Sequence, residues 1–125
     1  MADDLAALAA RTIFPILDLR KPAQLAASWA RARDLAAGGV GGFILFGGDS
    51  ATLAAELAAL RALSPRGLLI GSDLERGLGQ QVKGGAQQPP LRALGAANDP
   101  ALPEQAGFAV ARDALALGID WLYGP

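Results

Sequence analysis

A buried strand runs into an acidic loop at Leu68-Leu-Ile-Gly-Ser-Asp-Leu-Glu-Arg-Gly77. Apolar and small residues fill positions 68–72, as in a parallel strand that helices cover. Asp73 follows directly, and Glu75 and Arg76 come soon after it. Open α/β sheets and (β/α) barrels bind their ligands at the carboxyl ends of parallel strands. The segment therefore predicts a parallel sheet with a binding edge at Asp73.

The sequence on either side of this segment alternates between helical and strand patterns. Apolar residues recur at helical spacing in some segments, and short uninterrupted apolar runs indicate buried strands in others. In chain order we predict a short helix over 5–11, a strand over 11–18, a helix over 21–37, a strand over 43–46, a helix over 51–63, the strand over 68–72, a helix over 103–117 and a strand over 119–123.

Two features after the third strand add to this prediction. A polar loop is expected from Gly77 to about Pro100, and a loop of this length in a compact domain is usually functional. In the helix that follows, Pro103 suits the first turn, and Phe108, Ala111 and Leu115 share one face.

The order β-α-β-α-β-α-β fits two architectures, a doubly wound open sheet and part of a (β/α)₈ barrel. A whole barrel needs about 250 residues, roughly twice the 125 present here. We predict an α/β fold that forms the first half of a TIM-barrel-like domain, with about four β/α units over residues 1–125. A half-barrel leaves open sheet edges, so self-association through those edges is expected.

The amino-acid composition excludes several classes of function. The chain is 52% hydrophobic and 18% charged, as expected for a single folded domain. Its net charge is −1 and its basic residues are scattered, so the sequence shows no basic patch of the kind that binds nucleic acid. Cysteine and histidine are absent, which removes thiolate metal sites and the commonest general base. We expect no metal and no cofactor.

The amino end is acidic where a secretory signal would be basic, and no segment approaches the roughly 20 apolar residues of a membrane span. A cytoplasmic protein without a membrane partner is therefore expected.

Several segments resemble, in the right order, the N-terminal barrel domain of glycoside hydrolase family 3, the family of β-N-acetylhexosaminidases and β-glucosidases. The loop at residues 73–77 resembles the family's Asp-x-Glu-x-Gly motif, and the resemblance covers Val40 to Pro125. The other matching segments are 41–47, 80–82, 88–91, 93–97 and 118–120.

The resemblance implies a retaining mechanism, with an Asp nucleophile and a separate acid that lie downstream of the matched region. It also implies that Asp73 hydrogen-bonds hydroxyls of a carbohydrate substrate. The expected function is thus that of a fragment of a retaining β-glycosidase, which keeps part of the sugar-binding shell and holds no catalytic residue. By itself the chain is expected to be inactive.

The expected substrate-binding residues are Asp73, Glu75, Arg76 and Gln81. For Asp73 the alternative is a loop-capping role, and for Glu75 and Arg76 it is a local brace within the loop. Gln81 is a departure, because many hexosaminidases of the family carry an Arg there, and an amide does not replace a guanidinium fork. Lys83 is nearby and is expected to be solvated.

Other acidic and aromatic residues have mainly structural interpretations. Asp18 either lines the same binding edge at the carboxyl ends of the strands or caps a turn. Asp120 is expected to have a structural role. Trp121 and Tyr123 are expected to fill the barrel. Two further functions remain open, a non-catalytic half-barrel that pairs with another chain and a small doubly wound binding module, which would place the first strand inside the sheet.

Overall fold

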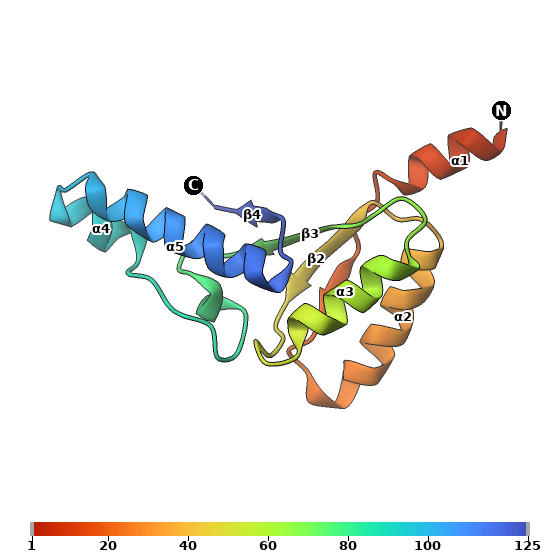
Figure 1. Cartoon of the computed structure of the whole chain (residues 1–125), viewed down its shortest axis with the longest axis horizontal. Helices are drawn as coiled ribbons and strands as arrows, with labels where there is room; N and C mark the ends of the chain where they lie inside the picture. Colours follow the sequence, from red (N-terminus) through yellow and green to blue (C-terminus); the bar gives the residue numbers. More distant parts are fainter. Residues whose placement is uncertain (1, 125) are drawn as a thin grey trace.

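Four parallel strands form one sheet in the computed structural model, which describes residues 2–124 and the side chains of residues 5–124. Each strand pairs with the next one in the sequence, so the order is β1-β2-β3-β4 (Figure 1). The strands are β1 (Ile16–Asp18), β2 (Gly42–Phe46), β3 (Leu69–Asp73) and β4 (Trp121–Tyr123). With β1 at an edge, this is not the order of a doubly wound sheet.

The helices lie mainly on one face of this sheet. Right-handed crossovers between strands taken in consecutive order place every connecting helix on the same side. Helix α2 packs against β1 and α3, and α3 packs against α5. Figure 1 shows α1 extending away from the sheet. The helices are α1 (Ala2–Ala10), α2 (Leu25–Ala37), α3 (Leu53–Leu63), α4 (Leu91–Ala97) and α5 (Ala101–Leu117), with short 3₁₀ turns η1 (Pro22–Gln24) and η2 (Leu78–Gln80).

The hydrophobic core lies between the sheet and these helices. Successive side chains of a strand point to opposite faces, and alternate residues of β2 and β3 therefore enter the core. Phe43, Leu45 and Ile70 are at most 1% exposed. Leu53 and Leu57 of α3 are fully buried against them. Burying one such side chain contributes about 1.5–3 kcal/mol to folding.

Within residues 2–124, no helix covers the opposite face of the sheet. One row of paired residues crosses all four strands on this face: Ile16, Ile44, Gly71 and Trp121. Ile16 is 61% exposed and Trp121 46% exposed. This face corresponds to the inside of a barrel. The predicted fold class, an α/β half-barrel, is confirmed.

Aromatic side chains partly cover the uncovered face near its β4 edge. The ring of Trp121 lies edge-on to Phe14, with centroids 6.0 Å apart, and packs against Tyr123 at 5.0 Å. Trp121 and Tyr123 therefore pack on the barrel-interior side, as predicted.

Several details differ from the sequence prediction. The first strand was expected over 11–18 and covers only Ile16–Asp18. The stretch expected to be a long loop contains α4, so that prediction was wrong over residues 91–97. Most of α4 is exposed, and Gly95 lies within it, so the segment lacks a strong apolar stripe. In α5, Phe108 and Leu115 lie on the exposed side at 72% and 66%, while Val110 and Ala114 face the core. No helix within residues 2–124 has the length and apolarity needed to cross a bilayer.

Candidate functional site

Asp73 is the last residue of β3 and lies at the carboxyl end of the sheet. The side chain of its neighbour Ser72 points to the helix-covered face of the sheet. There the Ser72 hydroxyl donates a hydrogen bond to the Leu45 carbonyl at 2.9 Å. Because side chains alternate along a strand, Asp73 lies on the uncovered face. Among the residues that the structure describes, no donor is hydrogen-bonded to the Asp73 carboxylate. The carboxylate therefore has acceptor capacity for a ligand.

Tyr123 lies next to Asp73, because the two residues are paired in the β3–β4 register. The tyrosine ring occupies space that only a glycine leaves open. A Cβ atom on Gly71 would lie 2.6 Å from Tyr123 Cε2. Gly71 thus leaves the space that the Tyr123 ring occupies on the uncovered face.

Glu75 and Arg76 belong to a braced loop. The Gln80 amide nitrogen donates to Glu75 at 2.7 Å, and the Gln80 amide oxygen accepts from the Arg76 backbone N–H at 2.8 Å. The hydrogen bond from Gln80 lowers the pKa of the Glu75 carboxyl below its usual value. The Arg76 side chain is exposed. These contacts agree with a local brace, in which the bracing residue is Gln80.

A second cluster of interacting side chains, Asp18, Arg20 and Phe46, lies at the carboxyl ends of β1 and β2. Asp18 accepts two side-chain hydrogen bonds from Arg20, at 2.8 and 2.7 Å, and one from its backbone N–H. These bonds hold the pKa of the Asp18 carboxyl well below its usual range and raise the pKa of Arg20. The guanidinium lies 4.9 Å from the centre of the Phe46 ring, as in a cation–π contact. Phe46 is paired with Asp18 on the uncovered face.

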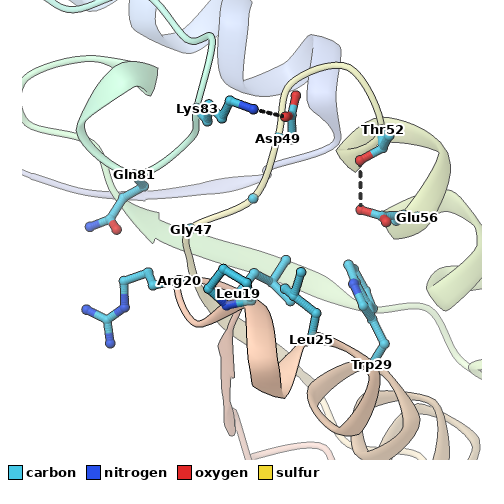
Figure 2. A pocket seen from close by; sticks show the side chains of 12 residues that line it. Leu19, Arg20, Leu25, Trp29, Gly47, Asp49, Thr52, Glu56, Gln81 and Lys83 are labelled. Carbon is cyan, nitrogen blue, oxygen red and sulfur yellow. Dashed lines mark hydrogen bonds and ion pairs between the residues drawn. The ribbon is translucent and has the colours of Figure 1, made fainter.

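Beside this group lies a pocket of about 490 Å³, which Figure 2 shows from close by. Gln81 and Lys83 line it, whereas Asp73, Glu75 and Arg76 do not. Lys83 is exposed and bonded to Asp49 at 3.1 Å. The pocket has apolar residues along one side, Leu19, Leu25 and Trp29, and polar residues around it, Arg20, Asp49, Thr52, Glu56, Gln81 and Lys83.

The predicted site residues therefore fall into separate groups. Asp73 lies on the uncovered face, and Gln81 lies in the pocket beside Arg20. Glu75 borders a smaller, mainly apolar pocket between β4, α4 and α5. Within the described residues, no three His, Cys, Asp or Glu side chains gather as metal ligands.

Asp120 has the structural role expected for it. Its carboxylate accepts from Arg61 and from the Ile70 backbone N–H, and so joins α3 to β3 and β4.

A model of the glycosyl hydrolase family 3 N-terminal domain matches residues 15–125 of the chain. This chain belongs to glycosyl hydrolase family 3. The match begins ahead of Val40, so it takes in all four strands of the sheet. A comparison with curated proteins found no match.

The family 3 domain also has polar residues that the sequence analysis did not single out. Arg20 is the clearest, because its place over Phe46 depends on the pairing of β1 with β2. A sequence signal existed in the spacing of Asp18 and Arg20, which allows the aspartate to accept from both the backbone and the side chain of a residue two positions later.

Proposed function

We propose that this family 3 domain supplies part of the sugar-binding shell of a retaining β-glycosidase that hydrolyses O-glycosyl bonds of β-N-acetylhexosaminides or β-glucosides. In this proposal Asp73 accepts hydrogen bonds from sugar hydroxyls, and Glu75, Arg76 and Gln81 contribute to the surrounding shell. The chain by itself binds the sugar without hydrolysing it. A cytoplasmic setting is part of the proposal, and cell fractionation tests it.

One observation carries this proposal. The Asp73 carboxylate stands at the carboxyl end of β3, on the uncovered face, without a hydrogen-bond donor among the described residues. A carboxylate accepts hydrogen bonds from neighbouring hydroxyls in a fixed geometry, and such charge-assisted bonds are among the stronger ones.

The test is a titration of the isotope-labelled chain with N-acetylglucosamine and with glucose, followed by NMR. The substitution Asp73→Asn keeps the size of the side chain and removes its charge. We expect it to weaken binding of the preferred sugar roughly tenfold, the loss of one hydrogen bond to a charged group. The matched control is Asp34→Asn, which removes the same charge from an exposed position on α2.

Equal binding by the wild type and Asp73→Asn overturns the proposal. So does the absence of binding of either sugar to the folded wild-type chain. A chromogenic assay with 4-nitrophenyl N-acetyl-β-glucosaminide and 4-nitrophenyl β-glucoside tests the second half of the proposal, and release of nitrophenol by the isolated chain contradicts it.

We also propose that the half-barrel associates with a second copy through its open sheet edges. The chain exposes 7469 Å², whereas a compact monomer of 12.7 kDa exposes about 6,200 Å². This excess of about 1,200 Å² includes the projecting helix α1 as well as the uncovered face, and a standard interface buries roughly 800 Å² on each partner. A two-fold axis along the strands would set β4 of one copy parallel to β1 of the other. In this arrangement the apolar residues of both uncovered faces become an interior.

A further inference from the structure

We infer that a pocket at the amino ends of β2 and β3 binds a small phosphate monoester with an apolar substituent. The pocket has a volume of about 280 Å³ and lies between the segment after α1, the start of β2 and the segment before β3. Figure 1 shows the end of α1 and the connection from α3 to β3 at this end of the sheet. Asp73 lies at the other end of the strands, so the inference does not rest on the proposed function.

Arg11 and Arg66 supply the charge of this pocket. Both line it, and among the residues that the structure describes no Asp or Glu does so. Neither arginine side chain takes part in an ion pair within the described part of the chain. Arginine stays protonated at ordinary pH, so the pocket holds two uncompensated positive charges. The larger pocket beside Arg20 differs, because Asp49 and Glu56 line it together with its cations.

A phosphate monoester matches this pair of charges. It carries a charge of about −1.5 to −2 at pH 7, because its second pKa is about 6. A guanidinium presents its N–H donors in a planar fork that pairs with two phosphate oxygens at once. Two such groups neutralise the dianion, whereas a single carboxylate would leave one of them without a partner.

Close backbone packing at Gly41 joins the two sides of the pocket. A Cβ atom on Gly41 would overlap the Arg11 carbonyl oxygen and lie 2.9 Å from Phe14 Cε2. The Gly41 N–H donates to the Ile13 carbonyl at 3.1 Å, and the Gly41 carbonyl accepts from the Leu69 N–H at 3.0 Å. Glycine thus lets the segment after α1 cross directly over the start of β2, and the hydrogen bonds connect that segment to β3.

The loop that carries Arg66 is held by the Ser64 side chain. The Ser64 hydroxyl donates to the Gly67 carbonyl at 2.9 Å and accepts from the Arg66 backbone N–H at 3.4 Å. Gly67 has a φ of +83°, in the left-handed region that favours glycine. The backbone of the loop is therefore fixed, and mainly the Arg66 side chain has to become ordered when a ligand binds.

The remaining side chains of the lining are apolar. Phe14 is partly buried and lies edge-on to Trp121, and Leu69 is 48% exposed on the uncovered face. An aromatic ring and a leucine beside two guanidiniums suit a ligand with an apolar group next to its charge. The volume of about 280 Å³ is just below the roughly 300–1,000 Å³ of drug-sized sites, so the apolar group is small.

Both arginines also lie beyond helix C-termini, where a cation offsets the helix dipole. Arg11 directly follows α1, and Arg66 follows the last residue of α3 by three positions. A role confined to the dipole predicts that substitution lowers stability and that the wild type does not respond to a phosphate. Ligand binding therefore distinguishes the two roles.

The test is an NMR titration of the ¹⁵N-labelled chain with phenyl phosphate, at constant ionic strength and at about pH 7.5, where the phosphate is mostly a dianion. Benzyl alcohol is the uncharged control ligand, and inorganic phosphate lacks the apolar group. We expect phenyl phosphate to shift the amide resonances of Gly41 and of residues 66–69 and to bind roughly tenfold more tightly than inorganic phosphate. Benzyl alcohol should leave these resonances in place.

Substitutions of the two arginines test the charge. We expect Arg11→Gln and Arg66→Gln each to weaken phenyl phosphate binding about tenfold, the loss of one hydrogen bond to a charged group. The matched control is Arg92→Gln, which removes the same charge from an exposed position on α4 and should leave binding unchanged.

A thermal measurement on the wild type needs no variant. Because a ligand that binds only the folded state stabilises it, phenyl phosphate should raise the Tm and benzyl alcohol should not. The inference is overturned if phenyl phosphate changes neither the resonances nor the Tm, or if Arg92→Gln weakens binding as much as the other two variants. Equal binding of phenyl phosphate and inorganic phosphate, or of phenyl phosphate and benzyl alcohol, overturns the ligand class.

Discussion

Asp120 forms an ion pair with Arg61, which lies 59 positions earlier in the chain at the end of α3. The same carboxylate accepts the backbone N–H of Ile70 at 3.0 Å, and Arg61 also donates to the Gly118 carbonyl at 2.6 Å. Two side chains thus connect α3 to the third strand and to the turn that leads into the fourth. Both are about two-thirds buried.

We expect Asp120→Asn to lower the free energy of unfolding by about 1–2 kcal/mol, because Arg61 loses its ionic partner and the Ile70 N–H loses a charged acceptor. Urea denaturation measures the change. Asp113→Asn is the control, since it breaks an ion pair with the adjacent Arg112, whose side chain is exposed, so that about 0.2–1 kcal/mol is expected. Equal losses in the two variants would show that the Asp120 contacts do not hold β4.

The substitution Gly71→Ala tests the space that the Tyr123 ring occupies. A methyl group there overlaps the ring, so we expect a loss of about 1–3 kcal/mol in unfolding free energy and a shift of the Tyr123 ring resonances in NMR. In α4, Gly95→Ala adds the same methyl group where no other atom lies within 4 Å. That control should be neutral or slightly stabilising, because alanine favours a helix over glycine. Unchanged Tyr123 resonances in Gly71→Ala would contradict the contact.

Asp18 should remain charged at a pH where ordinary aspartates are protonated. Its folded-state pKa is lowered by Arg20, so its stabilising contribution is complete above the unfolded value of about 3.9 and is lost as the pH falls through the lower folded value. In carboxyl ¹³C NMR from about pH 2 to 6, we expect wild-type Asp18 to remain largely ionised at the lower end of the range. In Arg20→Gln we expect the Asp18 midpoint to rise towards its ordinary value.

The control for this titration is Arg92→Gln, which removes the same charge from α4 and should leave the Asp18 midpoint in place. An Asp18 midpoint that is the same with and without Arg20 would refute the contact as the cause of the lowered pKa.

Self-association is tested with two leucines of similar exposure. Leu69 is 48% exposed on the uncovered face, and Leu63 is 45% exposed at the end of α3. Light scattering after size exclusion should find a dimer that dissociates on dilution. We expect Leu69→Lys to give a monomer and Leu63→Lys to remain dimeric. A wild-type chain that stays monomeric at high concentration, or equal effects of the two substitutions, would contradict pairing through this face.

The central strands were predicted well from the sequence, because uninterrupted apolar runs indicate buried strands. Predicted ranges 43–46 and 68–72 lie within one residue of β2 and β3. The order of the strands distinguishes a half-barrel from a doubly wound sheet, and hydrophobic patterns do not contain that order. The exposed helix α4 was missed, since it buries little and contains Gly95.

The candidate site was only partly predictable for a similar reason. The position of Asp73 at a strand end follows from the local sequence, because a strand end can be read from where an apolar run stops. The place of Arg20 over Phe46 depends on strand pairing, and the bond between Lys83 and Asp49 depends on the meeting of two loops. Contacts of this kind join residues that are far apart in the chain and leave no periodic signal.

The consecutive strand order also bears on how the chain folds during translation. Each strand after β1 pairs on one side with a strand that has already been synthesised, so none of these three waits for a later segment before its first pairing can form. β2 can join β1 while α3 is still inside the ribosome, and every following helix and strand extends an existing surface. A nascent chain of this topology grows its sheet from one edge, and β4 is the last strand to pair.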